Sequence, residues 1–107
     1  TVILDCITLL VNNLMFTDGI DIDNASEEEI NELEAYIQDQ IKKLMEEVKK
    51  TDLYFVMVTN EIGLGVVPGY KLGRVYCDFV GRINQMLGKL SDEVYFVVCG
   101  IPTKIKG

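Results

Sequence analysis

The chain has 107 residues, which suffice for one small domain and are too few for two. Its composition is 49% apolar and 25% charged, which is typical of a globular protein and not of a disordered one. The formal net charge of −7, without a basic run, argues against nucleic acid or an anionic membrane as a partner.

The cysteine and histidine content argues against a disulfide framework and a zinc site. The 3 cysteines are an odd number without paired spacing, so they do not form a disulfide framework, and the absence of histidine and of a CxxC pair argues against zinc. No secretory signal or membrane-length apolar run is visible. These features predict a cytoplasmic protein with reduced cysteines. The chain opens directly in a strand-like run without a methionine, which suggests that upstream sequence is missing.

The first predicted element is a buried strand, because residues 2–4 are apolar without interruption and Asp5 closes the run. Residues 6–16 suit a short helix, and residues 17–25 read as a polar loop. The strand therefore delivers one carboxylate directly before a helix.

A long amphipathic helix follows. Ser26 and Glu29 have the spacing of a capping box. Apolar residues then recur at three- and four-residue steps, which predicts a helix to about Lys50 with one face on a sheet.

The rest of the chain alternates in the same way. Residues 52–60 read as a second buried strand, residues 72–90 as a helix of nearly 20 residues, and residues 93–100 as a third buried strand. Residues 101–107 suit a short edge strand. We see no internal repeat or linker, so we expect residues 1–107 to form a single domain.

Apolar strands separated by helices are typical of an α/β fold with a mostly parallel sheet and helices on both faces. Parallel sheets of this kind bind ligands at the carboxyl ends of their strands. Asp5, the turn at residues 59–61 and Gly100 are therefore predicted to share one edge of the sheet.

Asp5 is the first candidate site residue. Four apolar or β-branched positions followed by an acid resemble a Walker B strand, whose carboxylate holds the Mg²⁺ shell of a nucleotide. Thr8 can direct its hydroxyl to the same place. An aspartate that merely caps the next helix explains the pattern equally well.

The loop after the second strand is the next candidate. Asn60 and Glu61 place a donor, an acceptor and a charge at the strand end, and Gly63 and Gly65 permit positive φ or close approach of a ligand. A strand-to-helix turn with a solvated Glu61 remains an alternative.

The helix after this loop carries further polar residues. Arg74 and Arg82 are eight positions apart and fall roughly on one face, where both could reach an anionic ligand or a neighbouring subunit. A solvated helix face accounts for them as well. Asn84 lies on the same helix.

Three stretches together carry a family resemblance: VILDCITLLVNNL, VTNEIGLGVVP and GRINQMLGKLSDEVYFVVCGIPTKIK. They closely resemble the carboxyl-terminal half of the bifunctional adenosylcobinamide kinase / adenosylcobinamide-phosphate guanylyltransferase family. The resemblance implies a three-layer P-loop (RecA-like) fold and a trimer. It also implies cobalamin biosynthesis, in which ATP or GTP phosphorylates the corrinoid substrate and GMP is then attached through a guanylylated histidine.

The resemblance assigns roles residue by residue. It implies catalytic roles for Asp5 and Glu61, with Asp5 also binding Mg²⁺. The positions that it implies for nucleotide or substrate binding are Thr8, Thr59, Asn60, Gly63, Gly65, Arg74, Arg82 and Asn84. The chain departs from the family at Gly69 and Tyr70, where the family has an acid and a polar residue, and at Cys77, which replaces a basic residue.

A larger departure is that the chain contains neither a GxxxxGK[ST] motif nor a histidine. Without them nothing cradles the phosphates and no guanylylated histidine forms. We therefore expect a carboxyl-terminal fragment that is inactive alone.

The alternative is a non-catalytic remnant that oligomerises or binds another protein. A receiver or flavodoxin-like module is disfavoured, because Asp5 has no second acid beside it and no strand-end lysine is present.

Overall fold

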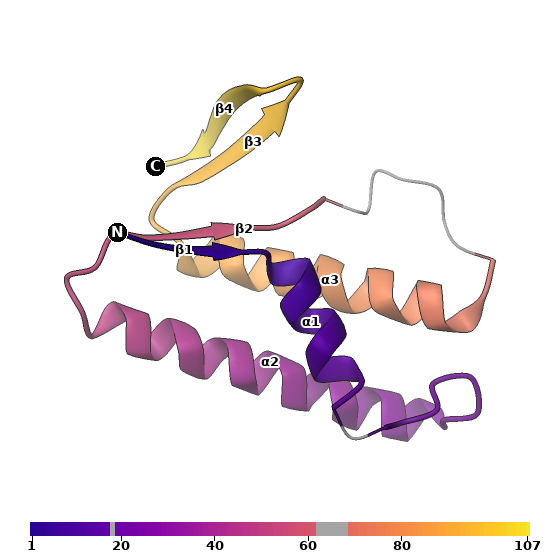
Figure 1. The fold of residues 1–107 in the computed structure, drawn as a ribbon. Helices are drawn as coiled ribbons and strands as arrows, with labels where there is room; N and C mark the ends of the chain where they lie inside the picture. Colours follow the sequence, from indigo (N-terminus) through magenta and orange to yellow (C-terminus); the bar gives the residue numbers. More distant parts are fainter. Residues whose placement is uncertain (18, 62–68) are drawn as a thin grey trace.

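A computed structural model describes residues 1–17, 19–61 and 69–107 of the chain. These residues form three helices and four strands, in the order β1 (Val2–Asp5), α1 (Ile7–Met15), α2 (Glu27–Lys49), β2 (Phe55–Val58), α3 (Lys71–Leu90), β3 (Val94–Val98) and β4 (Ile101–Lys106) (Figure 1). The predicted type and order of the elements are confirmed, but β2 covers only 4 of the residues predicted for the second strand. The predicted burial of the strands is wrong for β1 and β3, in which most residues are exposed because no described element covers their outer faces.

The start of α2 shows why the local predictions succeed. The Glu29 amide donates to Ser26 Oγ at 3.1 Å, and the Ser26 amide donates to Glu29 Oε1 at 3.3 Å. Both bonds of the predicted capping box are therefore present, and they satisfy amides that have no partner within the helix. Glu27 and Glu28 add negative charge at the positive end of the helix dipole.

The helices pack together around the main core. Their apolar stripes face one another, and the largest completely buried side chains are those of Phe79, Ile7, Met15, Ile37, Ile41, Ile83, Val11 and Val80. Among the described residues, no helix combines the length and the apolar character that a membrane crossing requires.

β1 and β2 form a parallel pair, with Val2 opposite Phe55 and Asp5 opposite Val58. Leu4 packs against the helical core, whereas its neighbour Ile3 points to the other face and is 66% exposed. In the described structure the helices thus cover one face of this pair. The prediction of a sheet covered on both faces is wrong for these residues, because no described helix packs against the face that carries Ile3.

The predicted third parallel strand is also wrong. β3 pairs with β4 in an antiparallel hairpin that forms a sheet separate from β1–β2. Cys99 and Gly100 connect these strands with φ angles of 52° and 75°, the positive values that a tight hairpin turn with the natural strand twist requires. Gly100 therefore lies in a hairpin turn and not at the edge shared with Asp5.

The hairpin is joined to α3 at its base (Figure 1). Lys106 Nζ donates to the carbonyls of Gly88 and Lys89 at 2.8 and 3.0 Å, at the carboxyl end of α3. A cation at this end complements the helix dipole. Most side chains of β3 and β4 are nevertheless exposed.

Candidate functional site at the carboxyl ends of β1 and β2

The carboxyl ends of β1 and β2 lie side by side. Because the strands are parallel and Asp5 is opposite Val58, the residues that follow β2 begin next to Asp5. Asp5, Thr59 and Asn60 are all exposed at this edge. The predicted juxtaposition of the first strand's carboxylate with the polar turn of the second strand is therefore confirmed.

Thr8 lies at the centre of the polar contacts at this edge. Its side chain is in the first turn of α1, and the residue is only 5% exposed. Asn60 Nδ2 donates to Thr8 Oγ1 at 3.4 Å, and Cys6 Sγ lies 3.0 Å from the same oxygen. The hydroxyl thus links the segment after β1 to the segment after β2.

Asn84 of α3 holds the other side of the turn. Its Oδ1 accepts a hydrogen bond from Thr59 Oγ1 at 2.7 Å, and its Nδ2 donates to the Asn60 carbonyl at 3.0 Å. The amide therefore uses both of its ends on two consecutive residues of the turn. This arrangement fixes the orientation of the Asn84 side chain and of the Asn60 backbone.

Tyr76, also on α3, reaches the segment after β1. Its hydroxyl donates to the Thr8 carbonyl at 3.1 Å. Partial burial, and secondarily the nearby Cys6 thiol, raise the pKa of Tyr76 above its ordinary value of 10.0. The phenol therefore stays a hydrogen-bond donor over the whole neutral and mildly alkaline range.

The raised pKa of Tyr76 gives a pH prediction. The folded chain holds this proton more tightly than the unfolded chain, so the resulting stability is present below pH 10 and is lost as the pH rises through the folded pKa. In a tyrosinate absorbance titration, we expect Tyr76→Phe to remove the step at highest pH. Tyr54→Phe, at a 66% exposed ring, is the control variant. An unchanged highest step in Tyr76→Phe would show that the hydroxyl is not held as described.

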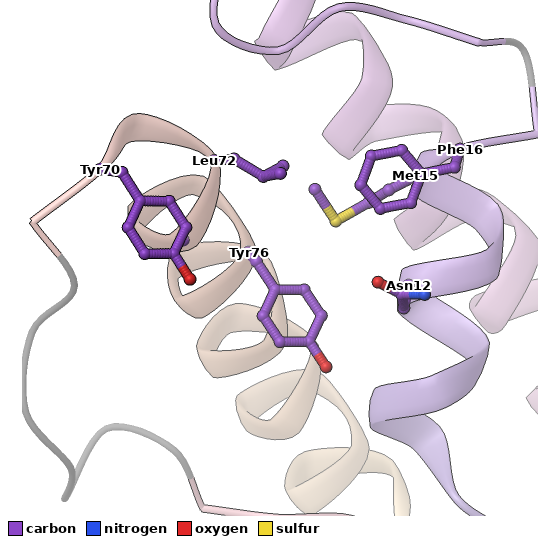
Figure 2. Close-up of a pocket in the computed structure, with 7 residues that line it drawn as sticks. Asn12, Met15, Phe16, Tyr70, Leu72 and Tyr76 are labelled. Atoms are coloured by element: carbon purple, nitrogen blue, oxygen red, sulfur yellow. The ribbon is translucent and has the colours of Figure 1, made fainter.

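A cavity of about 190 Å³ lies beside Tyr76, between α1 and the start of α3. Figure 2 shows the aromatic rings of Tyr70 and Tyr76 on one side and Met15, Phe16 and Asn12 on the other. Its volume is below the roughly 300–1,000 Å³ of typical ligand pockets, and it is too small for a whole nucleotide.

Comparison with known proteins decides the family. Residues 1–105 match the family model described as cobinamide kinase / cobinamide phosphate guanyltransferase. The chain belongs to this family. It is 40% identical over 105 residues to the bifunctional adenosylcobalamin biosynthesis proteins CobU of Escherichia coli and Salmonella typhimurium. It is 30% identical over 105 residues to the corresponding protein CobP of Pseudomonas aeruginosa.

The chain is much shorter than these relatives. The matches cover 98% of the chain but only 58% of the Escherichia coli and Salmonella typhimurium proteins and 53% of the Pseudomonas aeruginosa protein. It thus spans little more than half the length of the family members that it matches.

For Arg82, predicted to bind a ligand, the structure shows a protein partner. Its guanidinium makes two hydrogen bonds to the Glu34 carboxylate of α2, from Nε to Oε2 at 2.7 Å and from Nη2 to Oε1 at 2.5 Å. The hydrogen bond to Glu34, with its charge, raises the pKa of Arg82. The pair ties α3 to α2, so a ligand role for Arg82 stays a prediction that requires this ion pair to open.

The remaining predicted site residues are less defined by the structure. Glu61 directly follows Asn60 and is exposed, and Arg74 is exposed on the first half of α3. Gly63 and Gly65 lie outside the described residues. Their predicted roles therefore stay predictions.

Tyr76 was not among the site residues predicted from the sequence. The available signal was its phenol, since a partly buried tyrosine hydroxyl needs a hydrogen-bond partner. In the described parts of the chain no cluster of three or more His, Cys, Asp or Glu side chains could hold a metal. Asp5 ends β1 three residues before Thr8, and its single carboxylate fits Mg²⁺ because that ion often takes one or two protein carboxylates and keeps waters and phosphate oxygens.

Proposed function

We propose that this chain is the carboxyl-terminal part of a bifunctional cobinamide kinase / cobinamide-phosphate guanylyltransferase acting in cobalamin biosynthesis. The observation that carries the proposal is the family match over residues 1–105, together with 40% identity to the Escherichia coli protein. The substrates are a corrinoid and GTP or ATP. The chain contributes the strand-end residues of the site, and the phosphate-binding motif comes from sequence that it does not contain.

Each residue of the edge has a place in this reaction. Asp5 would hold Mg²⁺, which when bound neutralises charge on the transferring phosphoryl group. Glu61 adds a second carboxylate at the edge and could accept a proton from, or orient, the attacking hydroxyl. The hydrogen bonds of Thr59 to Asn84 and of Asn60 to the buried Thr8 hold the turn after β2 in place.

The exposed apolar residues of β3 support the proposal that the sheet of this chain lacks a neighbouring strand. β3 exposes Tyr95, Val97 and Val98 by 50%, 59% and 52%, and an isolated two-stranded hairpin is marginally stable in water. β4 carries a proline and two lysines, which discourage pairing at a strand edge, whereas β3 carries none. We propose that a strand from the portion of the family protein beyond this chain pairs with β3 and joins it to β1–β2. The result is a three-layer P-loop (RecA-like) fold with helices on both faces.

A reconstitution experiment tests the proposal. The chain would be co-expressed with the portion of the Escherichia coli relative that the match does not cover, and conversion of adenosylcobinamide would be followed by mass spectrometry with Mg²⁺ and GTP or ATP. We expect no turnover by either part alone and nucleotide-dependent phosphorylation by the pair. Turnover by the chain alone, or a bound pair without turnover, would contradict the proposal.

A second candidate function is a non-catalytic module that oligomerises or binds another protein. The exposed apolar surface of β3 and β4 favours it. Sedimentation of the purified chain distinguishes the two candidate functions. A stable oligomer that does not bind the added portion of the Escherichia coli relative supports the module, and a complex with that portion supports the enzyme. For the enzyme we propose a cytoplasmic homo-oligomer, a trimer by family resemblance.

A further inference from the structure

α3 braces both strand ends from one side. Tyr76 and Asn84 are eight residues apart on this helix, and each bonds to a different strand-end segment. The Tyr76 hydroxyl holds the Thr8 carbonyl after β1 at 3.1 Å. Asn84 holds Thr59 and the Asn60 carbonyl after β2, at 2.7 and 3.0 Å.

The two braced segments are also joined to each other. Asn60 Nδ2 donates to the Thr8 hydroxyl at 3.4 Å, which closes a ring of contacts from α3 through both segments and back to α3. Thr8 is three residues after Asp5, and Asn60 directly precedes Glu61. The ring therefore holds backbone that lies close in sequence to both acidic residues.

The chemistry of the ring makes its geometry specific. The Asn84 amide donates with one end and accepts with the other, so it fits the turn in one orientation. Thr8 is 5% exposed, so water cannot readily replace a hydrogen-bond partner that is lost there. A shift of α3 would therefore move both strand ends together.

We propose that Tyr76 and Asn84 are positioning residues that set the relative placement of the Asp5 and Glu61 carboxylates. Asn84 was predicted to bind nucleotide or substrate directly, but both ends of its amide are occupied by the turn. It acts on the ligand through Thr59 and Asn60. The consequence for catalysis rests on the proposed function; the geometric role does not.

The kinetic test uses the reconstituted protein. We expect Asn84→Ala and Tyr76→Phe each to lower kcat about ten- to hundredfold, with a smaller change in the KM for the nucleotide, since misplaced catalytic groups cost rate more than binding. Lys89→Ala, an exposed change on the same helix, should leave kcat unchanged. Val80→Ala, a buried core change, shows what lost stability alone does to kcat.

A rescue series separates positioning from general damage. Thr59→Val removes the hydroxyl that Asn84 accepts from, whereas Thr59→Ser keeps it. We expect the serine variant to retain kcat and the valine variant to lose it, and Thr59→Val combined with Asn84→Ala to cost less than the product of the two losses. The proposal would be overturned if the losses of Thr59→Val and Asn84→Ala were fully additive. It would also be overturned if Asn84→Ala and Tyr76→Phe lowered kcat no more than Val80→Ala does.

An NMR test on the 107-residue chain decides the geometric role without any activity. Tyr76→Phe keeps the ring, so it should fold even where Asn84→Ala does not. We expect it to shift the Asn60 side-chain amide and the Asp5 amide resonances, and Lys89→Ala to shift neither. Unmoved Asn60 and Asp5 signals in Tyr76→Phe would overturn the brace. A reconstituted protein without turnover, with these signals shifted as expected, would instead refute the proposed function alone.

Discussion

Phe79→Ala should lower the free energy of unfolding of the chain by about 3–5 kcal/mol, one of the largest effects of any single substitution in it. Phe79 is 1% exposed and is the largest completely buried side chain in the described core. Its removal leaves a cavity between α3 and the other helices, which cannot close fully because the interior is tightly packed. A domain of this size has a total stability of about 5–15 kcal/mol, so the loss is a large fraction of it. Urea unfolding followed by circular dichroism measures the change.

Tyr36→Ala is the matched control for Phe79→Ala. It also deletes an aromatic ring from a helix, but Tyr36 is 41% exposed on α2, so we expect a loss well below that of the buried ring. Phe79→Leu keeps most of the volume and should remain folded if the alanine variant does not. Equal losses for Phe79→Ala and Tyr36→Ala would mean that α3 does not pack into the core as described.

The helices could be predicted because their signals are local. The Ser26 capping box lies within one turn of chain, and the apolar stripe of α2 repeats every three to four residues. Their burial then follows from packing one stripe against another. Periodicity could thus predict which face of each helix is buried, but the prediction of α2 lying on a sheet did not anticipate that α2 packs with α1 and α3.

The sheet could be predicted only in part, because strand pairing depends on residues far apart in sequence. β1, β2 and β3 are all short apolar runs, and such runs do not specify their neighbours. The Cys99-Gly100 turn, with two positive φ angles, directs β3 back onto β4. The expected burial of β3 also requires covering surface, which the described residues do not provide.

The candidate site, too, could be predicted only in part. Asp5 and Asn60 could be placed together, since parallel strands bring their carboxyl ends to one edge. The ion pair of Arg82 could not be predicted, because Glu34 lies 48 residues away on another helix. The brace through Tyr76 was missed for the same reason: its partner, Thr8, is 68 residues distant.

In the reconstituted protein, Asp5→Asn should lower turnover at least about a hundredfold, because the amide cannot supply the negative charge that a Mg²⁺–nucleotide complex needs. Since Asp5 is exposed at the end of β1, the free energy of unfolding should change by no more than about 0.5 kcal/mol. Steady-state kinetics with GTP and ATP, alongside urea unfolding, measure the two effects separately. Loss of activity without loss of stability identifies a functional carboxylate.

The structure offers a control at the opposite end of the same sheet. Asp52 is an exposed carboxylate that precedes β2, whereas Asp5 ends β1. Asp52→Asn therefore removes the same charge from the opposite edge of the β1–β2 pair. We expect its turnover to stay at the parent level. Glu61→Gln should resemble Asp5→Asn, lowering turnover more than stability, because Glu61 follows the braced Asn60 at the same carboxyl edge. If Asp5→Asn and Asp52→Asn were equally active, the carboxyl edge of β1 and β2 would not be the site of phosphoryl transfer. Parent-level turnover in Glu61→Gln would show that turnover does not depend on this second carboxylate.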